Sequence, residues 1–248
     1  MIEHKREIQD VFLLTALQGM NYLAPLIVFP YLMVVLGAEK FGYIGFSLSI
    51  IQYLMLLVDF GFNFSATKRI AQSKNIQSEL NEIFWSTLYA KLLLLLLSFI
   101  LLIVIAFGFS KFQMYSKTMI IMFIMVVGNA FSFVWMFQGI GQIRIISIIN
   151  IVSKLTILPL TFFLVKGQSD YIKAAFILSF VYLFSGLIAT IFLINKRYIT
   201  KKVKANCAKI INEIKYAFPI FLSTAVASIY TALFVIILGY FSNPVEVG

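Results

Sequence analysis

The sequence predicts an all-α polytopic membrane protein with about seven transmembrane helices and a cytoplasmic N-terminus. Hydrophobic residues make up 61% of its 248 residues and charged residues 12%, whereas about a quarter of a soluble domain is charged. Long apolar stretches recur along the chain, and a helix of about 20 residues crosses the hydrocarbon core. Lysine and arginine gather in alternate gaps between these stretches, a pattern typical of membrane topology rather than of nucleic-acid binding.

The apolar stretches are expected to be helices, because every backbone group in the hydrocarbon core needs an internal partner and the alternating pattern of barrel strands is missing. The expected helices span residues 11–36, 42–64, 83–108, 118–139, 144–165, 172–194 and 216–241. Thirteen of the twenty Lys and Arg residues fall on the N-terminal side of the membrane and five on the other side. This excess places the N-terminus in the cytoplasm and the C-terminus, after seven crossings, outside.

The first expected helix carries polar residues and two prolines. Asn21 lies one turn before Pro25, and Pro30 follows. Prolines remove backbone donors, so we expect the helix to bend near its middle. A bent helix can act as a gate; the alternative is a kink that neighbouring helices simply accommodate. Polar groups inside a membrane usually face the bundle interior or a watery cavity, which makes Asn21 a candidate pathway residue.

The second expected helix carries a polar stripe that includes its one acidic residue. Gln52, Asp59 and Asn63 recur at helical spacings of seven and four residues. Lys91, in the third expected helix, is expected at a similar depth to Asp59. A paired charge is the least costly arrangement inside a membrane, so we expect these two residues to form an ion pair. The alternative is a direct role for Asp59 in proton or sodium coupling.

The fourth expected helix contains Asn129 and Ser132, which we expect to form hydrogen bonds between helices. Trp85 and Trp135 each lie near the expected cytoplasmic end of a helix. They are expected to belong to an aromatic belt at the membrane interface.

Lys154 is the most unusual residue of the fifth expected helix. It lies about ten residues into that helix, so at a rise of 1.5 Å per residue it is about 15 Å deep, near the bilayer midplane. Ser147, Asn150 and Thr161 share its helix face, and we expect this face to line a cavity. Lys154 is expected to attract an anionic head group or to take part in ion coupling; the alternative is a structural pair with an acid or with carbonyl groups.

The sequence divides into a six-helix lobe at residues 1–195, a basic cytoplasmic linker at 196–215 and the start of a second lobe at 216–248. We interpret the linker as a positive-inside anchor, with recognition of an anionic head group as the alternative. A weak internal repeat supports the division and predicts two lobes related by an axis along the membrane normal. At an offset of 206 residues, the matching pairs are Glu7 and Glu213, Ile8 and Ile214, and Phe12 and Phe218.

Catalysis is not expected. The sequence offers no nucleotide-binding loop, no zinc-binding helix pair and no nucleophile elbow. The single histidine, His4, is near the N-terminus, and the single cysteine, Cys207, lies in a lysine-rich stretch. We therefore expect no catalytic residue, no bound metal and no cofactor. We also expect no nucleic-acid partner, because the lysines and arginines are confined to short gaps between the apolar stretches.

Several strings resemble the O-antigen and related polysaccharide flippases of the multidrug, oligosaccharidyl-lipid and polysaccharide exporter superfamily. Together they run from one end of the chain to the other in the order typical of that family. They are QGMNYLAPLIVFPYLMVVLGAEKFG at 18–42, LLVDFGFNFSATKRIA at 56–71, FQGI at 137–140, NIVSKL at 150–155 and AFPIFLSTAVASIYT at 217–231.

The resemblance implies two lobes around a central polar cavity, and alternating access that moves an undecaprenyl-diphosphate-linked sugar repeat from the cytoplasmic to the periplasmic leaflet. Its implied partners are the lipid-linked oligosaccharide, membrane lipids and a coupling ion, proton or sodium. Asp59, Asn63 and Lys154 fall within the family-like strings. Family members have twelve or more crossings, so this sequence is expected to be truncated.

Three other functions compete with the flippase interpretation. A noncatalytic membrane subunit, or an inactive fragment, becomes more credible if the chain is complete at 248 residues. A cationic-drug exporter of the same superfamily is expected to have several acidic residues inside the membrane, whereas Asp59 is the only acidic residue in the expected helices. A membrane glycosyltransferase needs a large loop with catalytic residues, which the sequence lacks.

Overall fold

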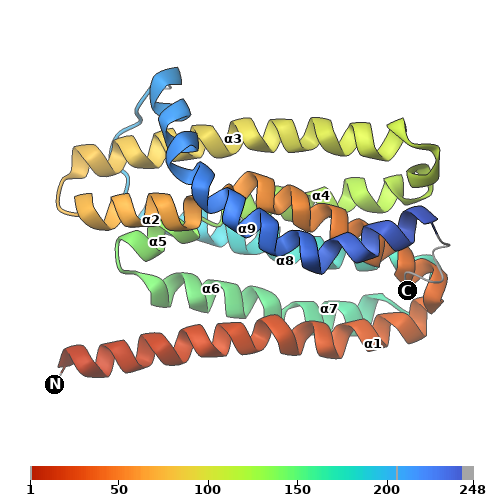
Figure 1. Ribbon diagram of the computed structural model, residues 1–248. Coiled ribbons are helices and arrows are strands. Elements are labelled where there is room, and N and C mark those ends of the chain that lie inside the picture. The colour runs from red at the N-terminus through yellow and green to blue at the C-terminus, as the bar shows by residue number, and fades with distance from the viewer. Residues whose placement is uncertain (1, 205, 242–248) are drawn as a thin grey trace.

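The chain forms a bundle of long helices in the computed structural model, which describes residues 2–204 and 206–241 (Figure 1). Six segments of the described chain are long and apolar enough to cross a membrane, and none of the described residues lies in a strand. This confirms an all-α polytopic membrane protein. Side chains are described at residues 15, 19, 22–204 and 206–227.

The longest helical element, α1, supplies two crossings rather than one. It spans Ile2–Asp59 and contains a single non-helical residue, Gly37, at φ 75° and ψ 160°. Glycine adopts such a positive φ because it has no Cβ. Figure 1 shows α1 running the length of the bundle and then turning back, so the six segments correspond to the seven predicted crossings. Helical backbone angles continue through Pro25 and Pro30, and the bend predicted there stays a prediction.

The second predicted helix, at residues 42–64, is interrupted. Phe60 and Gly61 take φ values of 42° and 79°, which end α1 and begin α2 (Phe62–Ser73). A Cβ placed on Gly61 would lie 2.9 Å from the Cβ of Ile220 and 3.0 Å from the carbonyl oxygen of Ala217. The prediction of one continuous helix was wrong because a distant segment of the chain packs directly on this point.

The third and fourth crossings are joined by a short 3₁₀ turn. Helix α3 spans Gln77–Gly108, the turn η1 spans Ser110–Tyr115 and α4 spans Ser116–Ala130. The predicted helix at 118–139 is in fact two helices, because the chain breaks at Phe133 (φ 49°) before α5 (Val134–Gly139). 

Trp135 corrects a further prediction. Its side chain is fully buried and packs against Phe84 and Phe133, so it does not belong to an interfacial belt.

The fifth crossing is also broken, whereas the sixth is continuous. The predicted helix at 144–165 consists of α6 (Ile143–Leu155) and α7 (Ile157–Leu164), separated at Thr156. After the 3₁₀ turn η2 (Gln168–Asp170), helix α8 spans Tyr171–Asn195. 

Helices α4 and α8 approach each other at two glycines. A Cβ on Gly128 would lie 2.3 Å from the Leu183 nitrogen, and one on Gly186 would lie 2.5 Å from the Gly128 carbonyl oxygen. Small residues at this crossing bring the two backbones together, as is common between membrane helices.

The last helix, α9, spans Cys207–Phe241 and begins nine residues earlier than predicted. Asn206 explains the early start, because its side-chain oxygen accepts hydrogen bonds from the backbone N–H groups of Ala208 and Lys209 at 3.0 and 3.4 Å. This is the usual cap of a helix N-terminus. The predicted linker at 196–215 therefore ends at residue 206, and its second half is helical.

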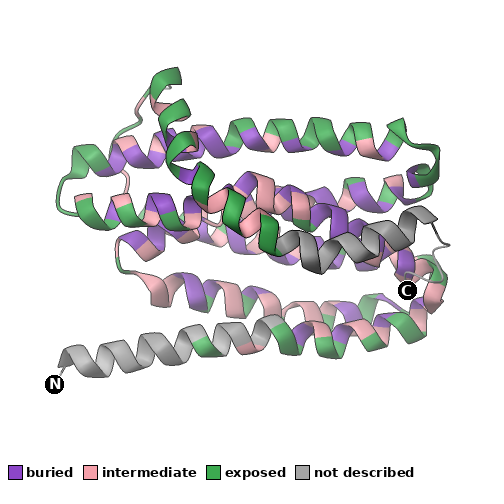
Figure 2. Cartoon of the chain, in the orientation of Figure 1, coloured by how far each residue is buried: buried purple, intermediate pink, exposed green. Residues whose placement is uncertain are grey.

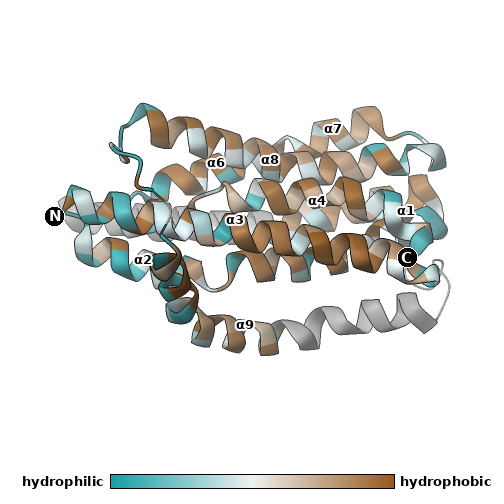
Figure 3. Cartoon of the chain, turned by 90° about the horizontal axis from the view of Figure 1, so that it is seen from above, coloured by the Kyte–Doolittle hydropathy of each residue, from teal (hydrophilic) through white to brown (hydrophobic). Residues whose placement is uncertain are grey.

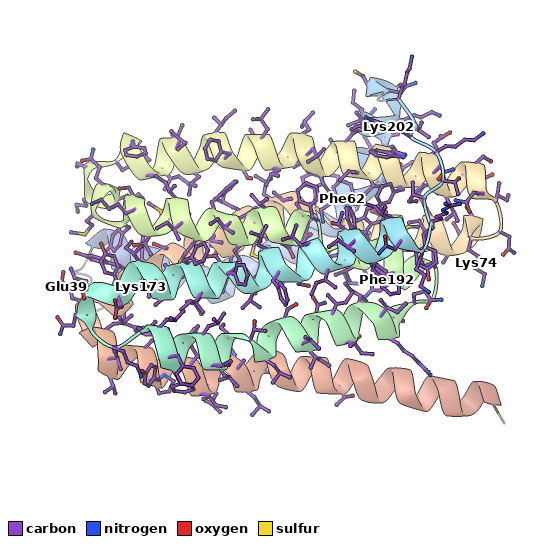
Figure 4. The ribbon with its side chains drawn as sticks, turned by 180° about the vertical axis from the view of Figure 1, so that it is seen from behind. Glu39, Phe62, Lys74, Lys173, Phe192 and Lys202 are labelled. Atoms are coloured by element: carbon purple, nitrogen blue, oxygen red, sulfur yellow. The ribbon has the colours of Figure 1, made fainter. Side chains whose placement is uncertain are left out.

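The two ends of the bundle are polar and its middle is apolar (Figure 3). Buried residues face the interior, while much of α3 is exposed along its outer side (Figure 2). Figure 4 places Lys74 and Lys202 at one end and Glu39 and Lys173 at the other. Lys74 and Lys202, predicted to be cytoplasmic, and Lys173, predicted to be outside, therefore lie at opposite ends of the bundle.

Candidate substrate pathway inside the helix bundle

Two adjoining cavities lie inside the bundle at the level of the α6–α7 break. Their volumes are about 250 and 240 Å³. Both are lined by Lys154, Val181 and Tyr182, so the two cavities meet at these three side chains. We call the two together the chamber.

One half of the chamber is polar. Its walls come from the end of α4, from α6 and from α8, and its polar residues are Asn129, Ser132, Asn150, Ser153, Lys154 and Ser185. The Ser185 hydroxyl donates a hydrogen bond to the side-chain carbonyl of Asn150. The Ser153 hydroxyl is fully buried and has no hydrogen-bond partner among the described residues.

The other half is largely apolar. Helix α1 contributes residues from both of its crossings, including Pro25, Val28 and Gln52, while α4, α7 and α8 contribute Met125, Ile157 and other apolar side chains. Gln52 is exposed in this wall, as its predicted place in a polar stripe requires. The chamber therefore passes from an apolar surface to amides and hydroxyls, with Lys154 between them.

Lys154 lies in the last turn of α6, two residues before the break at Thr156. It is half-buried, and it is the one charged side chain among the described residues that line the chamber. A cation at this depth is costly in lipid and usually marks a cavity or a pathway. Of the four residues predicted to share a cavity-lining face, Asn150 and Lys154 line the chamber, whereas Ser147 and Thr161 are not among its described lining residues.

A second polar group adjoins the chamber. The Lys91 ammonium lies 2.9 Å from one carboxylate oxygen of Asp59, and the Asn129 side-chain nitrogen donates to the other oxygen at 3.0 Å. The ion pair predicted for Asp59 and Lys91 is confirmed, as is the role of Asn129 as a partner between helices. Since Asn129 also lines the chamber, it joins the ion pair to the chamber wall.

The other predicted residues are placed less simply. Asn63 lies in α2, beyond the break at Gly61, and is not among the described residues that line the chamber. Asn21 lies in α1, but its side chain falls outside the described residues. Ser147 and Thr161 are fully buried, and their hydroxyls have no hydrogen-bond partner among the described residues.

Sequence reasoning missed three residues of the chamber: Ser153, Tyr182 and Ser185. Ser153 directly precedes Lys154, so the residue next to a predicted site residue was overlooked. Ser185 is a polar residue within an apolar helix, which is a usable signal for an interior position. Nothing in the sequence indicated its bond to Asn150, which depends on how α6 and α8 face each other.

A third polar group lies at the predicted cytoplasmic end, and it was not identified from the sequence. The buried carboxylate of Glu213 pairs with Arg69 and accepts a hydrogen bond from the Ser86 hydroxyl at 2.9 Å. Arg69 also lies over the ring of Tyr216, 5.4 Å from its centroid. These contacts fasten the first turns of α9 to α2 and α3.

The chamber can hold a ligand but offers little for catalysis. Amide, hydroxyl and ammonium groups can bind phosphate and sugar oxygens through hydrogen bonds. Among the described residues, no group of three or more His, Cys, Asp or Glu side chains is placed to hold a metal ion.

Comparison with known proteins points in the same direction. A family model described as "Polysaccharide biosynthesis protein" matches residues 8–248. The "Putative O-antigen transporter" of Escherichia coli (strain K12) is 35% identical to this chain over 243 residues, 97% of the chain and 58% of the relative. A protein of the same name from Shigella dysenteriae is 33% identical over 240 residues, 97% of the chain and 60% of the relative. The chain thus spans less than two thirds of the length of these relatives, and no solved structure matches it.

Proposed function

Since the chain belongs to the polysaccharide biosynthesis protein family, we propose that it acts in the translocation of undecaprenyl-diphosphate-linked O-antigen or related polysaccharide repeat units. The direction is from the cytoplasmic to the periplasmic leaflet. The chain is a multi-pass protein of the inner membrane. Its similarity to proteins named as O-antigen transporters supports transport rather than an enzymatic reaction.

The observation that carries the proposal is the position of Lys154 in the chamber wall. An ammonium group at the midplane attracts a diphosphate, while the amides and hydroxyls beside it are suited to sugar hydroxyls. The apolar half, which shares Lys154 with this wall, offers a surface for the lipid chain. The proposal therefore assigns the sugars to the polar half, the diphosphate to Lys154 and the lipid chain to the apolar half.

The charges also favour an anionic substrate over a cationic one. A chamber for cationic drugs needs an acid in its wall, and none of the described lining residues is acidic. Asp59 lies close by, but Lys91 offsets its charge. A role for Asp59 in proton or sodium coupling therefore requires Lys91 to release the carboxylate during the transport cycle.

Transport of a defined lipid-linked oligosaccharide, measured at matched expression, tests the proposal. Lys154→Ala is expected to lower the transport rate at least tenfold, while Lys154→Arg retains much of it because the positive charge stays. Lys117→Ala, which removes an exposed lysine at the outer end, is the matched control. Full transport by Lys154→Ala would refute the role of Lys154, and no transport by the unaltered chain would refute the proposed function.

A further inference from the structure

The segment between α8 and α9 is fastened along α3 by a row of four side chains. Gln77, Asn81, Trp85 and Tyr89 recur every four residues and therefore share one face of that helix. Each of them forms a hydrogen bond with the segment at residues 198–204, which we call the strap. The strap partners, in the same order along α3, are Tyr198, Thr200, Lys201 and Val203.

The hydrogen bonds fix the backbone of the strap rather than only its side chains. Gln77, Trp85 and Tyr89 donate to backbone carbonyl groups of the strap at 2.9, 2.9 and 3.1 Å. Asn81 pairs reciprocally with Thr200: its amide donates to the Thr200 hydroxyl at 3.1 Å and its carbonyl accepts from the Thr200 N–H at 3.0 Å. The strap therefore runs in register with about three turns of α3.

This fixed backbone presents lysines to the outside. Lys201, Lys202 and Lys204 are exposed, and none of them forms a salt bridge with a described acidic residue. Lys202 also lies over the Trp85 ring, 5.8 Å from its centroid. The strap thus carries concentrated positive charge in a defined geometry.

Two acids of α3 and α9 are engaged by other cations. Glu82 pairs with Lys209 at 2.7 Å, and Glu213 pairs with Arg69. Their charges are therefore offset locally and do not neutralise the strap lysines.

The surroundings of the strap fit the surface of a membrane. Figure 4 places Lys202 at the same end of the bundle as Lys74, the end where cytoplasmic charge gathers. Figure 1 shows α9 beginning beyond α3 and crossing the N-terminal part of that helix. Its first turns, which follow the strap along the chain, expose the side chains of Ile211 and Tyr216 at 51% and 63%. Basic and apolar groups side by side are typical of segments that lie at the lipid interface.

We propose that the strap is a binding surface for the anionic headgroups of phospholipids in the cytoplasmic leaflet, with Lys201, Lys202 and Lys204 contacting the phosphates. A positive-inside anchor needs only the number of its charges, so it does not require a backbone held by four side chains. Ordering a segment costs conformational entropy at every residue. A binding site for phosphates, which needs its lysines in fixed positions, explains why the strap is ordered. The inference does not depend on the proposed transport function.

Titration of the purified chain in detergent with phosphatidylglycerol or phosphatidylcholine, read by native mass spectrometry, tests the proposal. Lys201→Gln with Lys202→Gln is expected to weaken phosphatidylglycerol binding about tenfold or more, since each lysine near an anionic surface contributes a factor of roughly five. The matched control is Lys68→Gln with Lys74→Gln, two exposed lysines at the same end. If both double variants lose phosphatidylglycerol binding equally, the lipid binds through positive charge in general and the proposal is overturned.

A change that leaves all charges in place separates the fixed geometry from charge alone. Asn81→Ala removes the reciprocal pair with Thr200, and Trp85→Phe removes the donor to the Lys201 carbonyl while keeping an aromatic ring. Both variants are expected to weaken phosphatidylglycerol binding severalfold, with phosphatidylcholine binding unchanged. If Trp85→Phe folds normally and binds phosphatidylglycerol like the unaltered chain, the strap geometry is not the determinant. Stronger competition by inorganic pyrophosphate than by phosphatidylglycerol would assign the surface to a diphosphate instead.

Discussion

Lys91 and Asp59 form an ion pair in which the cation is the more deeply buried partner. The Lys91 side chain is 1% exposed and that of Asp59 is 26% exposed, with 2.9 Å between their charged atoms. Asn129 holds the second carboxylate oxygen of Asp59, so the acid keeps one partner if the lysine is removed. The two halves of the pair are therefore not equivalent.

Removing the acid is expected to destabilise the protein more than removing the base. Asp59→Ala leaves a fully buried ammonium group without its partner, a change that costs about 3–5 kcal/mol. Lys91→Met leaves a carboxylate that is partly exposed and still bonded to Asn129, and it is expected to cost less. The free energy of unfolding in detergent micelles measures both. The double variant should recover much of the loss, and absence of any recovery would argue against pairing.

The crossing of α4 and α8 is expected to tolerate no side chain at Gly128. An added Cβ would lie 2.3 Å from backbone atoms of α8, so either the two helices must move apart or the backbone at residue 128 must be strained. We expect Gly128→Ala to cost more than about 2 kcal/mol, as overpacking does elsewhere. Gly108→Ala, whose nearest contact would be 3.8 Å, is the control. Equal melting temperatures for the two variants would show that the close packing of α4 and α8 does not contribute to stability.

Ser153 allows the volume of the chamber to be tested apart from stability. Ser153→Ala removes a buried hydroxyl with no partner among the described residues and should leave stability within about 1 kcal/mol. Ser153→Leu adds bulk to the polar wall and is expected to reduce transport strongly. Ser147→Leu is the comparison, because Ser147 is buried on the same helix and is not among the described lining residues. Transport at the original rate in Ser153→Leu would show that the polar half is not used.

The single cysteine offers a direct test of topology. Cys207 is exposed at the first residue of α9, at the predicted cytoplasmic end. A membrane-impermeant maleimide should label it in inverted vesicles and leave it unlabelled in intact spheroplasts. Labelling from the outer side alone would reverse the orientation drawn from the loop charges.

The same thiol reports on the contact between Arg69 and Glu213. Arg69→Gln leaves the buried Glu213 carboxylate without its cation, so the first turns of α9 should loosen from α2 and α3. A spin label on Cys207 is expected to become more mobile in this variant. Lys68→Gln, one residue away and exposed, should leave the label unchanged. Equal mobility in both variants would mean that the pair does not hold α9 in place.

The crossings could be predicted from the sequence because they depend on length and hydropathy alone. The break at Gly61 could not, because it goes with packing between distant segments, whereas the break at Thr156 has a local signal in Pro159, which has no N–H to donate to the Leu155 carbonyl. Gly61 illustrates the reason: its conformation goes with the close approach of Ile220, which lies far along the chain.

Site residues could be predicted where their position depends only on depth in the membrane. Contacts that depend on the rotation of a helix about its own axis could not be predicted. Asp59 and Lys91 could be matched by their expected depths in neighbouring helices, and Lys154 by its position within one helix. The bond between Asn150 and Ser185 depends on the relative rotation of α6 and α8, which hydropathy does not record. The row from Gln77 to Tyr89 was visible as a spacing of four, but its partner segment was not.

The pair of Lys91 and Asp59 also sets a condition on how the protein is made. Lys91 lies near the middle of α3, where a lysine raises the free energy of membrane insertion by about 2.5–3.5 kcal/mol. Asp59 precedes α3 in the chain, so the compensating acid is synthesised first. If α1 waits beside the translocon until α3 arrives, the two charges can enter the lipid together. Biogenesis of this bundle thus favours release of its first helices as a group rather than one at a time.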